Sequence, residues 1–163
     1  MDGADWLTVD PDLNIEAPAL REILALWQCK CGDRAMPARS DFGPEELRAH
    51  MGWIVLVDVE PAPLRFRYRL IGTELTQWVG RDSTGRYLDE LYAPEIYDTA
   101  ISAYLAAIER RRPVRAHGRF LHAEKGHLPF ESLDMPLSAD GETVSMIMSR
   151  DQIHPPPPRR FGA

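Results

Sequence analysis

Two neighbouring strand-like segments between residues 53 and 70 constrain the fold more strongly than any other feature of the sequence. The first, WIVLVDV at residues 53–59, is a continuous apolar run with many β-branched side chains, which is typical of a strand covered on both faces. The second, LRFRYRL at residues 64–70, alternates arginine with apolar side chains, as a strand does when its two faces differ. Only EPAP separates them, so we expect an antiparallel hairpin.

Helical patterns on either side of this hairpin, with three further strand-like runs, predict a single α+β domain. Residues 18–34 place apolar side chains at spacings of three and four, the pattern of an amphipathic helix. Residues 94–112 carry a second helical stripe, which Pro113 ends. We therefore expect a five-stranded antiparallel sheet with helices on one face, and an N-terminal amphipathic helix that packs on the sheet or at a dimer interface. The later strands are expected at residues 114–122, 128–137 and 143–150.

Composition divides the chain into four segments. The polar N-terminal segment and the proline-rich C-terminal segment lack an apolar pattern that could form a core, so both are expected to be flexible. A helical extension and the core domain lie between them. The expected boundaries are residues 1–17 for the flexible N-terminus, 18–52 for the helical extension, 53–150 for the core and 151–163 for the mobile tail.

The charge and the hydropathy of the chain exclude several classes of partner. A formal net charge of −6 over 163 residues argues against nucleic acid, because phosphate binding needs clustered lysine and arginine. No apolar run reaches the roughly 18 residues that a membrane-spanning helix requires, so no membrane insertion is expected. The N-terminal sequence MDGADWLTVDPDLNIE lacks the basic and apolar regions of a signal peptide, which predicts a cytoplasmic location.

The sequence contains no constellation that would support catalysis or a metal site. Ser83 follows Asp82 in a turn, but a serine nucleophile needs a base and an oxyanion hole, and the chain has no G-x-S-x-G element. His117, His122 and His127 fall on or near two adjacent strands, where surface or hydrogen-bonded histidines are the common case. We expect no enzyme and no metal, with a small α+β enzyme as the lesser alternative.

Three stretches between residues 24 and 91 form a distinctive combination: LALWQCKCGDRAMPARSDFGPEELRAHMGWIVLVDV, FRYRLIGTEL and GRDSTGRYLDEL. Together they resemble the PAS sensor domain, and more narrowly the short, stand-alone PAS proteins of proteobacteria known as the PAS-5 type. The resemblance covers about residues 18–150 and implies a PAS fold. It also implies a non-catalytic sensor that acts in signal transduction through a small-molecule ligand, a signalling protein partner or both. We expect such a protein to form a homodimer.

The same resemblance disfavours the two common PAS cofactors. Haem-binding members place an iron-ligating histidine on the long helix, and residues 94–112 contain none. Flavin photosensors carry a reactive cysteine in a G-R-N-C turn, where this chain has Gly80, Arg81, Asp82 and Ser83. We therefore expect no bound cofactor.

Large apolar side chains from the elements around the inner sheet face are the expected walls of a ligand pocket, although they could equally fill a solid core. They are Tyr68, Trp78, Tyr92, Ile101, Tyr104, Phe120, Phe130, Met146 and Met148.

Two arginines are candidate polar anchors for a ligand, Arg39 and Arg69. The alternative is a structural salt bridge to Asp41, Asp58 or Asp89. The apolar stripe of the N-terminal helix is the expected surface for a second copy or a partner, through Leu20, Ile23, Leu24 and Trp27.

A cluster of arginines supports a different function, the binding of a nucleotide second messenger. Guanidinium groups suit phosphates, and RRRPVR contains an R-x-x-x-R spacing through Arg111 and Arg115. With the later SADG, it loosely resembles the PilZ pattern for cyclic di-GMP. The aspartate expected two residues before that serine is absent, since position 136 is proline. The cluster consists of Arg110, Arg111, Arg112 and Arg115.

Overall fold

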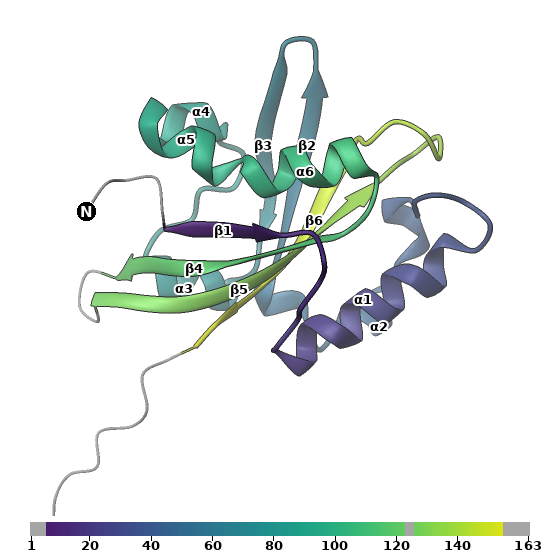
Figure 1. Ribbon diagram of the computed structural model, residues 1–163, viewed down its shortest axis with the longest axis horizontal. Helices are drawn as coiled ribbons and strands as arrows, with labels where there is room; N and C mark the ends of the chain where they lie inside the picture. Colours follow the sequence, from purple (N-terminus) through teal and green to yellow (C-terminus); the bar gives the residue numbers. More distant parts are fainter. Residues whose placement is uncertain (1–5, 123–125, 155–163) are drawn as a thin grey trace, which may run out of the picture.

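A six-stranded antiparallel sheet forms the centre of the protein. The structure is a computed structural model, and it describes residues 6–122 and 126–154. The strands lie side by side in the order β1-β4-β5-β6-β2-β3 (Figure 1). The α+β class is as predicted, with one strand more than the expected five. The strands are β1 (Leu7–Asp10), β2 (Ile54–Pro61), β3 (Leu64–Ile71), β4 (Val114–His122), β5 (Gly126–Leu137) and β6 (Met146–Ile153).

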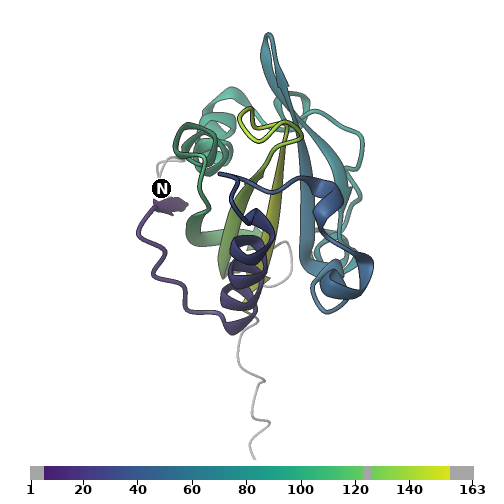
Figure 2. The same ribbon diagram turned by 90° about the vertical axis from the view of Figure 1, so that its right-hand side faces the viewer.

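Helices occupy both faces of this sheet. The helix α6 packs on β4 and β5, whereas α1 packs on β5 and β6, and the two helices lie apart in both views (Figures 1 and 2). We call the face under α4, α5 and α6 the inner face and the face under α1 the outer face. The α-helices are α1 (Pro18–Cys31), α2 (Pro44–Leu47), α3 (Thr73–Val79), α4 (Leu88–Leu91), α5 (Pro94–Ala100) and α6 (Ser102–Arg110). Two short 3-10 helices cover Arg39–Asp41 and Met51–Trp53.

The extra strand β1 lies within residues 1–17, which were predicted to be flexible, and corrects that prediction for Leu7–Asp10. Residues 1–5 of this segment and residues 155–163 of the predicted mobile tail lie outside the described residues. It pairs with β4, with Leu7 opposite Gly118 and Asp10 opposite Arg115. Asp10 then accepts hydrogen bonds from the main-chain N–H groups of Asp12 and Asn14, which turns the chain toward α1. A strand of four residues is too short to show a clear alternation, so sequence pattern alone did not reveal it.

Two other boundaries differ from the predicted ones for local reasons. The strand β6 covers Met146–Ile153 rather than 143–150, because the Asp140 carboxylate accepts the N–H groups of Glu142 and Thr143 and holds them in a loop. The last strand therefore takes the first residues of the expected tail. The predicted long helix is divided into α5 and α6, and the Ser102 hydroxyl donates to a carbonyl of the preceding turn.

The predicted helix at the N-terminus packs on the sheet of its own chain. Leu20, Ile23 and Trp27 are buried, and the Trp27 indole donates a 3.0 Å hydrogen bond to the Pro136 carbonyl. These three side chains therefore contribute to the core, which corrects their assignment to a dimer or partner surface. Leu24 is half-buried at the edge of the same contact.

A buried ion pair on the outer face ties the N-terminal segment to the sheet. Arg115 donates to Glu131 at 2.6 Å and also reaches Asp10 at 3.3 Å. The Glu131 carboxylate accepts the main-chain N–H groups of Glu16 and Ala17, immediately before α1. Burial by itself raises the pKa of Glu131, but these main-chain bonds and the guanidinium bring the pKa below its ordinary value. One carboxylate thus positions both β1 and α1.

The pairing of β1 depends on a glycine in β4. A Cβ at Gly118 would lie 1.9 Å from the Trp6 carbonyl oxygen, so Gly118→Ala is expected to displace β1 from the sheet edge. We expect faster amide exchange at residues 7–10, measured by hydrogen–deuterium exchange. In the control Gly43→Ala the added Cβ meets nothing closer than a Glu46 carboxylate oxygen at 3.6 Å. Unchanged exchange at β1 in Gly118→Ala would contradict this role.

Candidate ligand-binding cavity

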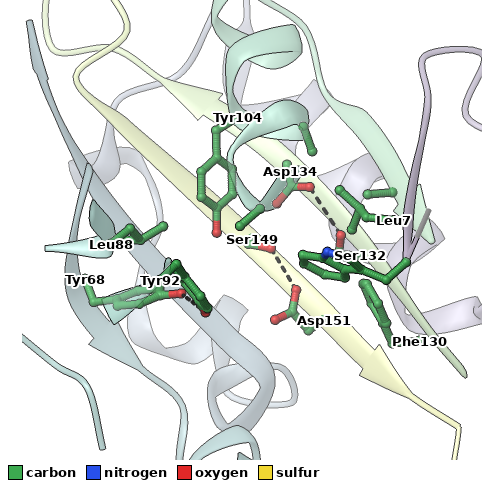
Figure 3. Close-up of a pocket in the computed structure, with 14 residues that line it drawn as sticks. Leu7, Tyr68, Leu88, Tyr92, Tyr104, Phe130, Ser132, Asp134, Ser149 and Asp151 are labelled. Carbon is green, nitrogen blue, oxygen red and sulfur yellow. Dashed lines mark hydrogen bonds between the residues drawn. The ribbon is translucent and has the colours of Figure 1, made fainter. Parts of the chain in front are cut away.

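A cavity of about 150 Å³ lies between the inner face of the sheet and the helices α4 to α6 (Figure 3). We call it the inner cavity. Strand β1 closes one side of it, and its floor is formed by Ala116 of β4 and by alternate residues of β5 and β6. Its lining consists of Trp6, Leu7, Tyr68, Leu88, Tyr92, Ala100, Ala103, Tyr104, Ala116, Phe130, Ser132, Asp134, Ser149 and Asp151.

The floor contains a serine and an aspartate from each of two adjacent strands. In the antiparallel register Ser132 lies opposite Asp151, and Asp134 lies opposite Ser149. The Ser132 hydroxyl donates to Asp134 at 3.2 Å, and the Ser149 hydroxyl donates to Asp151 at 2.8 Å. Two carboxyl groups therefore lie on adjacent strands, diagonal to one another, in an otherwise mainly apolar and aromatic wall.

Burial shifts the protonation of both carboxyl groups. It raises the pKa of Asp134 to about 7, with a further contribution from the negative charge of Asp151. Burial likewise raises the pKa of Asp151 to about 6, although the Ser149 hydrogen bond and the Arg150 charge oppose the rise. Arg150 itself belongs to the outer face, where it donates to His50 and lies over Trp53. At neutral pH the floor is thus close to a change of charge.

Three tyrosines face this floor from β3 and from the helical side. The hydroxyls of Tyr68 and Tyr92 form a hydrogen bond of 3.1 Å, and the Tyr104 hydroxyl points toward the cavity (Figure 3). Burial raises the pKa values of Tyr68 and Tyr104, so both side chains stay neutral at physiological pH. The Tyr104 ring also packs on Phe66, with the ring centroids 5.5 Å apart. Tyr68 and Tyr104 thus offer aromatic faces and neutral hydroxyls, not charges.

Four of the nine predicted pocket residues line the inner cavity: Tyr68, Tyr92, Tyr104 and Phe130. Three lie outside its lining. Ile101 is buried, Trp78 is half-buried on α3, and Phe120 packs edge-on against Phe130 with the ring centroids 6.4 Å apart.

Met146 and Met148 were predicted to line the pocket on the inner face, and this prediction was wrong. Ser149 and Asp151 line the inner cavity, so strand alternation directs Met146 and Met148 to the outer face. A one-residue change of strand phase moves every side chain to the other face, and the true β6 boundary was needed to fix that phase.

The two candidate polar anchors are also remote from the inner cavity. Arg39 donates to the Phe42 carbonyl at 3.2 Å, and Arg69 is exposed and pairs with Asp58 at 3.5 Å. For Arg69 the alternative interpretation, a structural salt bridge, is the one that the structure supports. Neither side chain belongs to the lining.

The polar residues of the floor were missed by sequence reasoning, although the sequence carries a signal for them. Both β5 and β6 contain the pattern S-x-D, as SLD at residues 132–134 and SRD at residues 149–151. This spacing places the serine and the aspartate on the same face of a strand. Two such patterns in consecutive strands predict a polar patch within an apolar face. Trp6 and Leu7 were missed with β1.

A second, larger hollow of about 540 Å³ lies beside α1. We call it the arginine hollow, because three consecutive arginines contribute to it. Arg115 is not among them, since its guanidinium is held in the buried ion pair with Glu131. The predicted arginine cluster is therefore reduced to three members. The hollow is lined by Pro11, Leu13, Leu24, Trp27, Gln28, Ala35, Arg110, Arg111, Arg112 and Pro113.

Other functional features were sought in the described ranges 6–122 and 126–154. No group of three or more His, Cys, Asp or Glu residues in these ranges is arranged to hold a metal ion. No helix within them has both the length and the apolar character needed to cross a membrane.

Solved structures with a similar arrangement of elements share little sequence with this chain. The PAS domain of a protein from Colwellia psychrerythraea is 13% identical with a TM-score of 0.48, and the match covers 68% of this chain and 94% of that one. The Rhodobacter sphaeroides LOV protein is 13% identical with a TM-score of 0.49, covering 72% of this chain and 68% of that one. The PAS-B domain of Drosophila melanogaster Cycle is 12% identical with a TM-score of 0.46, and the match covers 62% of this chain and 98% of that one. No curated protein matches the chain.

Sequence comparison with protein families gives a direct assignment. A family model described as a PAS domain, of the PAS-5 type, matches residues 15–149, which is most of the chain. The matched region includes every strand except β1 and the end of β6. PAS domains are signal-sensing modules that are typically not catalytic. The predicted resemblance is confirmed, and the chain belongs to the PAS domain family.

Proposed function

We propose that this chain is a non-catalytic sensor that binds a small molecule in the inner cavity and reports its occupancy to a protein partner. The observation that carries the proposal is the cavity itself, which combines an aromatic wall with a polar floor. A few converging polar groups in a mainly apolar recess are the usual composition of a small-molecule site. No cofactor is required by this arrangement.

The elements around the cavity supply a route from ligand to partner. Strand β1 contributes Leu7 to the lining, Trp6 lies immediately before it, and β1 also forms one edge of the sheet. A ligand that binds better when β1 is docked would shift the population toward the docked state. A sheet edge can pair with a strand of another chain, so docking of β1 changes what a partner or a second copy can bind.

Native mass spectrometry tests whether the cavity takes a ligand. The purified chain is equilibrated with the small-molecule fraction of a cell extract, and we expect one added mass per chain. Ala103 is 3% exposed and lines the cavity, so Ala103→Leu fills the space and is expected to lose that mass. Equal retention in both proteins, or no added mass in either, would refute the proposal.

The arginine hollow favours a second candidate function, the binding of an anionic nucleotide. Arg110, Arg111 and Arg112 could meet phosphates while Trp27 offers an aromatic surface. For this function we expect cyclic dinucleotide binding that weakens as salt rises and weakens about tenfold in Arg111→Ala, measured by calorimetry. Arg48→Ala removes an exposed arginine elsewhere and serves as the control. Equal binding by Arg111→Ala and the wild type would exclude it.

A further inference from the structure

The inner cavity contains two acids and no base. Asp134 is 2% exposed, and neither lysine, arginine nor histidine is among the residues that line the space around it. A buried carboxylate without a counter-charge is costly, so such groups are normally paired, protonated or bound to a cation. The guanidinium of Arg150, the residue before Asp151, is directed to the outer face, where it donates to His50.

The hydrogen-bond donors on the floor do not replace a counter-charge. Ser132 and Ser149 each have one hydroxyl proton: Ser132 donates to Asp134 and Ser149 donates to Asp151, although Ser149 also lies within hydrogen-bond reach of Asp134 on the neighbouring strand. Two protons therefore serve two carboxyl groups, which together offer four oxygens. The Tyr104 hydroxyl points toward the same space (Figure 3). The cavity thus presents surplus carboxyl oxygens and the Tyr104 hydroxyl to whatever enters it.

The walls add a second, independent preference for positive charge. Aromatic rings from β3, β5, α6 and Trp6, which precedes β1, line the same space as the carboxyl groups, and the ring centroids of Trp6 and Phe130 lie 6.5 Å apart. The face of an aromatic ring attracts a cation, most strongly for an organic ammonium group whose apolar part also gains contact. A hydrated metal ion has no apolar part, so it gains no such favourable contact with aromatic walls.

We propose that the ligand of the inner cavity is a small organic cation, a protonated amine whose ammonium group meets Asp134 and Asp151 while its apolar part lies against the aromatic walls. This rests on the proposed sensor function and names its ligand class. A cavity of about 150 Å³ accommodates a molecule the size of benzene, so the cation has about six non-hydrogen atoms.

Titration calorimetry with matched probes tests the charge preference. Butylammonium and tetramethylammonium are compared with 1-butanol, which is neutral, and with butyrate, which is negative. We expect saturable one-to-one binding of an ammonium probe, and binding of 1-butanol and butyrate at least about tenfold weaker. Asp134→Asn keeps the shape of the side chain and is expected to weaken ammonium binding by at least about tenfold, as is Asp151→Asn. Ala103→Leu should abolish it. Asp98→Asn removes the same charge from an exposed position of α5 and should bind as the wild type does.

Each other outcome overturns the inference. Ammonium binding that persists in Asp134→Asn, Asp151→Asn and Ala103→Leu would locate it outside the cavity. Binding of 1-butanol or butyrate in preference to ammonium, lost in Ala103→Leu, would overturn the charge preference and leave the sensor function standing. If no probe binds, the inference fails, and a mass retained from the cell extract would still support the sensor function. If Asp134 and Asp151 only take up and release protons, no ammonium probe will bind at any pH.

Discussion

Replacing Glu131 with methionine is expected to lower the free energy of unfolding by about 3–5 kcal/mol, the largest single effect that the structure predicts. The change leaves Arg115 buried without its 2.6 Å partner, and it leaves the N–H groups of Glu16 and Ala17 without an acceptor. The loss is measured by urea denaturation. A loss below about 1 kcal/mol would contradict the role of this carboxylate as the anchor of β1 and α1.

A double-mutant cycle separates the ion pair from the main-chain contacts of Glu131. The double variant Arg115→Met with Glu131→Met is expected to cost less than the sum of the two single changes, because no unpaired charge remains. Glu109→Ala, at an exposed position of α6, controls for the loss of a negative charge. Strict additivity would show that the two side chains do not stabilise one another.

Replacing Asp134 with asparagine is expected to stabilise the protein at alkaline pH. The pKa of Asp134 rises from 3.8 to about 7 on folding, so the folded state holds its proton more tightly than the unfolded state. The contribution of this group to stability is therefore complete below the unfolded pKa and is lost as pH rises to about 7. Asparagine resembles the protonated form. We expect a gain of about 2–4 kcal/mol near pH 8 and little change near pH 4.

The measurement is the free energy of unfolding of both proteins over this pH range. The other titratable groups that face Asp134 are Asp151 and the three cavity tyrosines, and the difference between variant and wild type isolates Asp134 from them. Asp98→Asn controls for the removal of one charge from the surface. A gain that is the same at all pH values, or a loss near pH 8, would contradict the raised pKa and thus the lack of a counter-charge.

The parts of the fold that could be predicted are those with a long pattern. The hairpin of β2 and β3, the helix α1 and the strand β4 each carry enough apolar or alternating residues to define their type. The strand β1 has four residues and depends on pairing with distant residues of β4, which no local pattern encodes. The phase of β6 depended on the loop that Asp140 holds, so Met146 and Met148 were assigned to the wrong face.

Four aromatic residues of the cavity lining were among the predicted pocket candidates, whereas the residues of its floor were not. Large apolar side chains indicated a pocket, whereas Asp134 and Asp151 stood in segments that otherwise appeared to be core strands. Gly72 is required for a steric reason that no pattern shows, because a Cβ there would lie 2.2 Å from the Gly52 carbonyl oxygen. Such contacts between distant segments decide side-chain identity without leaving a periodic signal.

A crystal structure of the chain after equilibration with the small-molecule fraction of a cell extract tests the central claim most directly. We predict electron density for one small molecule in the inner cavity, with a polar atom within about 3 Å of the carboxyl groups of Asp134 and Asp151. Density that contains only water in the inner cavity, or side chains that have moved to fill it, would contradict a ligand-sensing role.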